Sequence, residues 1–495
     1  MPTATTQSLS DAAREFVSAG PQKLLLGGER LEAADGRTFE TIDPATGEAI
    51  CDVAQAGPED VDRAVAAARA ALDGPLRKVS ASKRAGLMYS LGELIKANGE
   101  ELAELESLDN GKPVAAAKGD IAATIGHLRY YAGWPTKIEG ETIPVSGRDL
   151  LCYTLREPVG VCAQIVPWNY PLLMAMWKVA PALAAGCSLV LKPAEQTPLT
   201  ALRLGELALE AGFPEGTMNV LTGDGHTGAA LVDHPSVDKV AFTGSTAVGR
   251  EIGAKCGRSL KRVTLELGGK SPNIILPDAD LEAAVKGSFL GLYSNSGQAC
   301  NAASRLLVQA GMFDDVVERL AEFAREAKVG PGLDPESQFG PVISAEQFGR
   351  VTSYIDSGLS EGAEAVAGGL PDGNGDGGYF IEPTLFTGVT DEMRIAREEI
   401  FGPVLVAQPF EDLEEVARRA NETEYGLAAG LWTRDISNAH KLAAMLKAGS
   451  VYINTWGAGD PAAPFGGYKA SGFGREKGHA NLEAYLETKS VFVQL

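Results

Sequence analysis

Short apolar runs alternate with helical patterns between residues 159 and 267. The strand-like runs lie at 159–166, 188–192, 218–222, 239–243 and 262–267, and the helical patterns between them lie at 171–185, 198–211, 227–232 and 246–256. Strands that alternate with helices in this way form a parallel sheet covered on both faces. The pattern therefore predicts an α/β sheet that binds nucleotides at the carboxyl ends of its strands.

A second α/β region follows, and the chain ends in a strand-like segment. Helical patterns occur at 281–293, 313–327, 345–358, 413–420 and 438–448. Earlier helical patterns at 58–71 and 82–98 are expected to pack on the first sheet. The glycine-rich segment 368–378 predicts an exposed loop. Segment 487–495 predicts an edge strand that needs a partner.

Composition and charge exclude several classes of function. The 495 residues, 45% of them hydrophobic, are enough for about three domains. The chain has 44 Lys and Arg and 65 Asp and Glu, so its net charge is −21. A surface with this much negative charge repels phosphate backbones and anionic lipids. We therefore expect no nucleic-acid partner and no membrane partner. The uncharged segment 158–177 contains three prolines, which is typical of a strand, a turn and a helix start rather than of a membrane span.

Cysteine and histidine usage indicates a reducing compartment and no metal site. The six cysteines are scattered without a C-x-x-C motif, and the five histidines form no metal-binding pair. The N-terminal segment carries Asp11, Arg14 and Glu15 and lacks the apolar run of a secretion signal. We therefore expect a cytoplasmic protein.

Three residues stand where catalytic groups are expected. Cys300 follows the sequence Asn-Ser-Gly-Gln-Ala, and small polar neighbours suit a reactive thiolate better than an inert core position. Asn169, between two prolines, offers either an amide donor for an oxyanion or a hydrogen bond that stabilises the turn. Glu266 ends the fifth strand and is followed by two glycines, so it is either a functional carboxylate or a helix cap or ion-pair partner of Lys270.

Two glycine motifs compete as the phosphate-binding site of a nucleotide. Residues 223–228 match G-x-G-x-x-G between a strand and a helix, as in a dinucleotide fingerprint, but a tight turn also needs small residues there. One unit later, Gly244 and Gly249 bracket the first turn of a helix whose free N–H groups can hold a pyrophosphate. The residues alone leave both assignments open.

Seven motifs along the chain resemble those of the NAD(P)-dependent aldehyde dehydrogenase superfamily. They occur in the order of the family at 167–169, 192–195, 242–245, 266–270, 297–300, 399–403 and 464–472, and the resemblance extends from about residue 23 to residue 495. It implies an aldehyde dehydrogenase-like α/β fold with three parts. These are a Rossmann-type NAD-binding domain (1–135 and 159–267), an α/β catalytic domain (268–476) and a small oligomerisation β-extension (136–158 and 477–495).

The resemblance also implies a role for each candidate. Cys300 would attack the aldehyde, Asn169 and the Cys300 backbone N–H would hold the oxyanion, and Glu266 would activate the water that hydrolyses the thioester. The phosphates of the cofactor would lie at the 244–249 helix rather than at the 223–228 loop. Lys178 either assists near the active site or is a surface lysine.

The cofactor implied is NAD, with NADP less favoured because the charge of Glu195 would repel a 2′-phosphate. The residues matched to its binding are Lys192, Glu195, Gly244, Ser245, Gly249, Trp168, Glu399 and Phe401. No metal is expected.

The residues matched to the aldehyde tunnel are apolar or aromatic: Tyr170, Met174, Trp177, Trp456 and Phe465. No arginine is placed to hold a substrate carboxylate, which favours a medium-sized aliphatic or aromatic aldehyde. Aromatic residues also hold quaternary ammonium groups, so a betaine aldehyde or amino-aldehyde is the alternative substrate. A homodimer or homotetramer is expected.

Three other classes of protein fit the sequence less well. An inactive paralogue would have lost the nucleophile or the base, whereas Cys300, Asn169 and Glu266 are all present. A dehydrogenase that transfers the acyl group to CoA commonly lacks the base that Glu266 would supply. A cysteine hydrolase would need a histidine partner, and no histidine lies in a matching motif.

Overall fold

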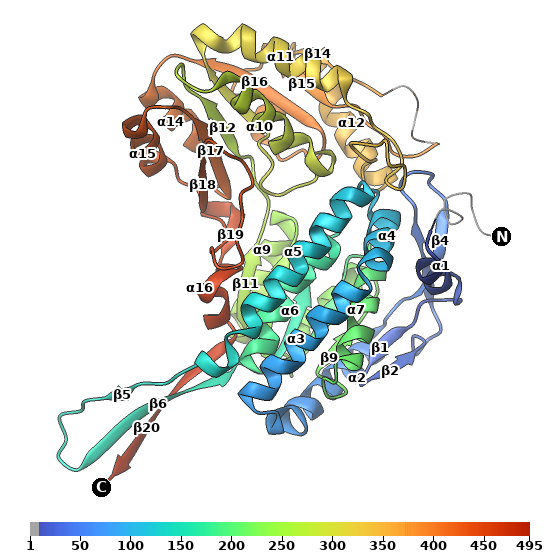
Figure 1. Ribbon diagram of the computed structural model, residues 1–495, viewed down its shortest axis with the longest axis vertical. Coiled ribbons are helices and arrows are strands. Elements are labelled where there is room, and N and C mark those ends of the chain that lie inside the picture. Colours follow the sequence, from blue (N-terminus) through green and yellow to red (C-terminus); the bar gives the residue numbers. More distant parts are fainter. Residues whose placement is uncertain (1–8, 372, 374, 376) are drawn as a thin grey trace.

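The computed structural model describes residues 9–371, 373, 375 and 377–495 (Figure 1). The first sheet has eight strands in the order β19-β11-β10-β7-β8-β9-β1-β2. Five parallel strands at its centre lie close to the predicted runs: β7 (Val161–Ile165), β8 (Ser188–Lys192), β9 (Met218–Val220), β10 (Lys239–Thr243) and β11 (Arg262–Glu266). The edges are antiparallel: β1 (Leu24–Leu26), β2 (Glu29–Leu31) and β19 (Gly472–Phe473).

Helices cover both faces of this sheet. Because successive strand residues point to opposite faces, Leu189 and Leu191 of β8 pack in one core cluster and Val190 packs in another. The first cluster includes α3 (Ala81–Ala97), α4 (Gly99–Asn110), α5 (Val114–Ala132), α6 (Pro171–Ala185) and α7 (Leu199–Glu210). The second includes α2 (Pro58–Asp73), α8 (Gly225–Asp233) and α9 (Thr246–Ser259).

The second sheet has seven strands in the order β14-β15-β16-β13-β12-β17-β18, and only β14 is antiparallel. Their bounds are β12 (Pro272–Ile275), β13 (Arg305–Gln309), β14 (Glu364–Ala367), β15 (Thr384–Thr387), β16 (Val404–Phe410), β17 (Ala428–Trp432) and β18 (Ser450–Ile453). The helices around it are α10 (Leu281–Tyr293), α11 (Phe313–Glu326), α12 (Ala345–Ser360), α13 (Arg394–Arg397), α14 (Leu413–Asn421) and α15 (Ile436–Met445). Part of the predicted loop 368–378, residues 372, 374 and 376, lies outside the described residues.

A three-stranded sheet projects from the rest of the molecule as a long ribbon (Figure 1). In it, β20 (Leu486–Gln494) pairs along its whole length with β6 (Leu150–Pro158), which also pairs with β5 (Thr142–Ile143). The predicted edge strand at the end of the chain therefore finds a partner within the chain. Phe492 and Leu495 remain 63% and 76% exposed. They leave apolar surface for a contact beyond the chain.

The remaining elements are small: α1 (Asp11–Ser18), the hairpin of β3 (Thr38–Ile42) and β4 (Ala49–Ala54), and α16 (Gly478–Glu483). In the described part of the chain, no helix is both long enough and apolar enough to cross a bilayer.

Candidate active site

A cavity of about 990 Å³ lies where the two large sheets meet. On one side it is lined by residues at or just after the carboxyl ends of β7, β10 and β11 of the first sheet. On the other side it is lined by residues of β18 in the second sheet and of the helices α10 and α12 around that sheet. Carboxyl ends of parallel strands are where α/β sheets bind ligands. The volume is that of a site for a cofactor or a sizeable organic substrate.

Cys300 lines this cavity and is half-buried. It follows the 3₁₀ turn η4 (Ser294–Gly297), in which Asn295, Ser296 and Gly297 all have positive φ, at 51°, 55° and 73°. A Cβ at Gly297 would lie 2.1 Å from the carbonyl oxygen of Gly402, so a side chain there would clash with the backbone. The glycine thus lets the cysteine loop pack against the segment at 402. None of the other five cysteines lines the cavity.

The Cys300 thiol is neutral in this environment. Burial and the nearby carboxyl groups of Glu399 and Glu266 raise its pKa to about 12. The nucleophile therefore needs a base to remove its proton, or positive charge brought by a ligand.

We expect the alkylation rate of Cys300 in the free enzyme to rise about tenfold per pH unit between about pH 7 and 10, because only the thiolate reacts. Iodoacetamide labelling followed by mass spectrometry of the Cys300 peptide measures this rate. A rate that levels off below about pH 8 would contradict the raised pKa.

Asn169 is held against the cysteine loop. It follows β7, and its Nδ2 donates a hydrogen bond of 2.9 Å to the carbonyl oxygen of Gln298. In return, Asn295 Nδ2 donates to the Asn169 carbonyl oxygen at 2.9 Å. The side-chain amide thus bonds to a segment 129 residues away rather than within its own turn. The structure therefore brings Asn169 and Cys300 together at one cavity wall.

Glu266 ends β11 and lies behind the cavity wall. It is 3% exposed, and neither carboxylate oxygen has a hydrogen-bond partner among the described residues. A Cβ at Gly466 would lie 2.6 Å from Glu266 Oε1, so the carboxylate points toward the residue that follows the cavity-lining Phe465. Burial first, and then the charge of Glu476, raise the pKa of Glu266 well above its usual value. A carboxyl group with this environment is typical of a general base or acid.

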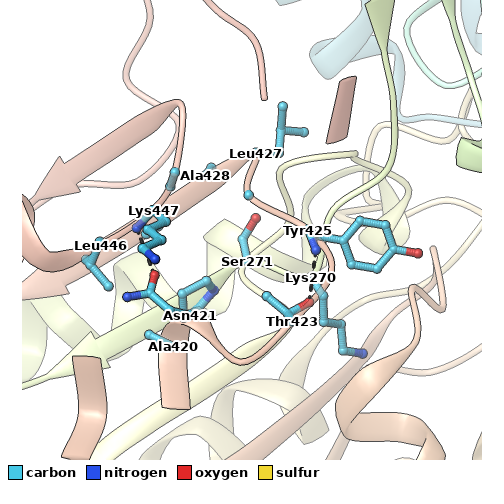
Figure 2. Close-up of a pocket in the computed structure, with 14 residues that line it drawn as sticks. Lys270, Ser271, Ala420, Asn421, Thr423, Tyr425, Leu427, Ala428, Leu446 and Lys447 are labelled. Carbon is cyan, nitrogen blue, oxygen red and sulfur yellow. Dashed lines mark hydrogen bonds between the residues drawn. The ribbon is translucent and has the colours of Figure 1, made fainter. Parts of the chain in front are cut away.

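The suggested ion pair between Glu266 and Lys270 is absent from the structure. Lys270 Nζ is buried and has no partner within the described residues. Figure 2 shows Lys270 in a second pocket, beside Thr423 and Tyr425. That pocket measures about 10 Å³, room for one water molecule at most. It is therefore no substrate site.

Lys178 is fully buried, so the surface-lysine alternative is wrong. Its Nζ donates to Glu476 Oε1 at 2.5 Å and to Thr243 Oγ1 at 2.6 Å. The charge of Lys178 lowers the pKa of Glu266, whereas that of Glu476 raises it. Because Thr243 lines the cavity, a hydrogen-bonded path leads from the cavity wall to the interior beside Glu266.

Sequence analysis left Lys178 open and missed Glu476. Lys178 is the single charged residue of the otherwise apolar α6, a signal that indicates a buried partner. Glu476 stands in the run Arg475-Glu476-Lys477, which is typical of a solvent-exposed turn. The sequence carries no sign of its burial.

Five of the residues matched to the cofactor line the cavity: Trp168, Gly244, Ser245, Glu399 and Phe401. Ser245 is the N-cap of α9, and its Oγ accepts from Val248 N at 3.4 Å. No residue of the 223–228 loop lines the cavity. Gly244 and Ser245 do line it, and the choice of the 244–249 helix for the phosphates stays a prediction.

The other three cofactor residues, Lys192, Glu195 and Gly249, do not line the cavity. Lys192 ends β8, and its Nζ lies 3.4 Å from Glu195 Oε2. Gly249 lies within α9, where a Cβ would come 2.3 Å from the Leu267 side chain. The glycine thus permits close packing of the helix on the segment that follows β11.

The segment at 399–401 is fixed by two residues that sequence analysis missed. Phe401 has a φ of 62°, and its carbonyl oxygen accepts from Gln347 Nε2 at 2.7 Å. Arg350 Nη2 donates to the carbonyl oxygen of Glu399 at 2.7 Å. The ring of Phe401 meets that of Trp168 edge-on at 5.2 Å. Both helix residues belong to α12 and line the cavity.

All five residues matched to the aldehyde tunnel line the cavity: Tyr170, Met174, Trp177, Trp456 and Phe465. The rings of Trp177 and Phe465 meet edge-on at 5.2 Å. Two further lining residues, His127 and Lys477, were missed. They add polar groups to a wall that the sequence predicts to be apolar.

The fold and the site combine a parallel α/β sheet with a cysteine held at the wall of a large cavity beside the carboxyl ends of its strands, the place where such sheets bind ligands. The model of the aldehyde dehydrogenase family matches residues 31–491, and the chain belongs to that family. The predicted family, fold and enzyme class are thereby confirmed.

Relatives and solved structures agree with this assignment. A putative aldehyde dehydrogenase of Bacillus subtilis is 53% identical over 96% of both chains, and the human mitochondrial aldehyde dehydrogenase is 49% identical over 98% of this chain and 96% of its own. The NAD+ complex of an aldehyde dehydrogenase from Bacillus cereus has a TM-score of 0.96 at 51% identity, covering 98% of this chain and 99% of that chain. A betaine aldehyde dehydrogenase from Staphylococcus aureus has a TM-score of 0.95 at 41% identity, covering 98% and 97%.

Proposed function

We propose that this enzyme oxidises an aldehyde to a carboxylic acid with NAD, through a thiohemiacetal and a thioester on Cys300. One observation carries the proposal: a half-buried cysteine and a buried amide, Asn169, are held by one loop at the wall of a large cavity. The similarity to the Bacillus cereus NAD+ complex supports the choice of cofactor.

The residues divide the reaction into two easier steps. Cys300 first loses its thiol proton to solvent, a loss that the positive charge of a bound nicotinamide would favour. Its Sγ then attacks the carbonyl carbon, while Asn169 Nδ2 and the Cys300 N–H stabilise the oxyanion. A bound NAD would supply the acceptor for the hydride that leaves this carbon. Glu266 then removes a proton from the water that hydrolyses the thioester. Lys178 and Glu476, which pair with each other, act on Glu266 through their charges, and Lys178 also donates to Thr243 at the cavity wall.

The residues present fit a dinucleotide. The N-terminus of α9 opens on the cavity at Gly244 and Ser245, where free N–H groups favour a pyrophosphate. We assign the adenosine ribose to Lys192 and Glu195, and the nicotinamide ribose and ring to Glu399 and Phe401. A Cβ at Gly268 would lie 2.2 Å from Glu399 Oε2, so the glycine leaves room for the carboxylate at this end.

Glu195 should make the enzyme prefer NAD to NADP. Its carboxylate would face the 2′-phosphate, a like-charge contact that lowers kcat/KM by about tenfold or more. Glu195→Gln should narrow this preference, whereas Glu210→Gln, on the exposed surface of α7, should not. Equal kcat/KM for both cofactors in the unmodified enzyme would contradict the assignment.

The aromatic and aliphatic lining supports a medium-sized aliphatic or aromatic aldehyde as substrate. Betaine aldehyde or an amino-aldehyde is the second candidate, because aromatic rings line the cavity and the Staphylococcus aureus relative acts on betaine aldehyde by its name. The reduced-nicotinamide absorbance on addition of hexanal, phenylacetaldehyde or betaine aldehyde tests both. Faster turnover with CoA would instead indicate acyl transfer.

We also propose the domain boundaries of the enzyme, its oligomeric state and its location in the cell. We assign 1–135 and 159–267 to an NAD-binding domain, 268–476 to a catalytic domain, and 136–158 with 477–495 to oligomerisation. The exposed apolar residues of β20 and β6 favour a homodimer or homotetramer. The six free cysteines fit the reducing cytoplasm.

A further inference from the structure

Lys477 brings a positive charge to the aromatic end of the cavity. It is 6% exposed and lines the cavity, and its Nζ lies 5.1 Å from the ring centroid of Trp177 and 5.8 Å from that of Phe465. None of the hydrogen bonds or ion pairs of the described residues involves this Nζ. A Cβ at Gly459 would lie 3.4 Å from it, so the absence of a side chain there leaves the amine room.

No acidic residue of the cavity wall faces this lysine as a partner. The two carboxylates that line the cavity, Glu346 and Glu399, belong to α12 and to the segment assigned to the nicotinamide. Burial lowers the pKa of Lys477, and the charge of Asp460 only partly opposes this effect. Asp460 does not line the cavity and accepts from Ala462 N at 2.8 Å. Burial lowers the pKa of His127, which disfavours its charged form, and its Nδ1 donates to Ala123 O at 2.8 Å.

A buried ammonium without an anionic partner is costly, and contacts with two aromatic rings offset only part of that cost. A substrate carboxylate at this end of the cavity would complete the pair. A quaternary ammonium group would bind poorly at this end of the cavity. Lys477 already contacts the two aromatic rings that could hold such a group, and its positive charge repels a second cation.

We propose that Lys477 selects aldehydes that carry a carboxylate at the end remote from the formyl group and disfavours cationic aldehydes. This inference rests on the proposed oxidation of aldehydes and narrows its substrate class. The oxidation of such a substrate gives a dicarboxylic acid, so both the substrate and the product would place an anion beside Lys477.

Three aldehydes of similar length test the proposal: pentanal, 5-oxopentanoate and 4-(trimethylammonio)butanal. We expect kcat/KM to be about tenfold or more higher for 5-oxopentanoate than for pentanal, and lowest for the cation. Lys477→Met should abolish the preference for the carboxylate and raise kcat/KM for the cation. Lys477→Arg, which keeps the charge, should retain the preference. Each aldehyde has its own intrinsic reactivity, so its kcat/KM is compared between the unmodified enzyme and each variant. This ratio does not depend on the intrinsic reactivity.

The outcomes separate this inference from the proposed function. If none of the three aldehydes yields NADH, the proposed function itself fails. If pentanal is oxidised and the unmodified enzyme shows no preference for 5-oxopentanoate, only the role of Lys477 is overturned, and this comparison needs no variant. An unchanged preference in a folded Lys477→Met protein, with NAD affinity intact, would also overturn it.

Discussion

Replacing Cys300 with alanine is expected to lower aldehyde turnover by more than about 10⁴-fold, since the attacking thiol is lost and the remaining groups cannot form the covalent intermediates. Binding of NAD should change little, because the assigned cofactor contacts lie at Ser245, Glu399 and other residues that the substitution leaves intact. Turnover is measured by NADH absorbance, and cofactor affinity by fluorescence titration.

Cys51→Ala provides the matched control. Burial raises the pKa of Cys51 to about 12, as for Cys300, but Cys51 lies in β4 and does not line the cavity. The control variant should keep full activity. Residual turnover within about tenfold of the unmodified enzyme in Cys300→Ala would assign the nucleophile to another group.

The five central strands of the first sheet could be predicted because most of their residues are buried, so that short apolar runs mark them in the sequence. The edge strands β1, β2 and β19 were not predicted. The start of α9 was also predicted at residue 246, where the structure shows a local cap by the Ser245 side chain. α4 and α5 were not predicted, since α4 buries polar residues whose partners lie outside the helix. Glu106 pairs with Lys112 at 3.3 Å, and Asp109 Oδ2 accepts from Leu199 N. Such residues look exposed until the tertiary structure supplies those partners.

Some residues of the candidate site could be predicted from the sequence, and others could not. Cys300 and Asn169 could be predicted because they stand in motifs of unusual local composition, and the structure places both at the cavity. Glu476 and Lys477 belong to a charged run that carries no sign of burial, yet they are 1% and 6% exposed. Their positions depend on the chain returning from the second sheet to pair β19 with β11. The sequence therefore pointed to candidate groups that lie at the cavity, but not to the charges around them.

Glu266→Gln is expected to lower steady-state turnover by about 10²–10⁴-fold, the usual contribution of a general base. The amide keeps the shape of the side chain but cannot take a proton, so hydrolysis of the thioester slows while its formation continues. A burst of about one NADH per site should therefore precede slow turnover. Rapid-mixing fluorescence of NADH measures the burst. A slow or missing burst would assign Glu266 to deprotonation of Cys300 instead, and undiminished turnover would remove it from the mechanism.

The charges beside Glu266 predict how the pH dependence of hydrolysis responds to substitution. Since only the ionised carboxylate acts as a base, the rate should rise with pH through the raised pKa of Glu266. Lys178→Met removes a charge that lowers this pKa and should move the rise to higher pH, whereas Glu476→Gln removes one that raises it and should move the rise to lower pH. Each variant also leaves one member of the buried pair without its partner, which costs about 3–5 kcal/mol of stability. The rate of hydrolysis is therefore measured against pH for each folded variant, at a temperature below its melting temperature. Shifts in the same direction, or none, would show that these charges do not act on the base.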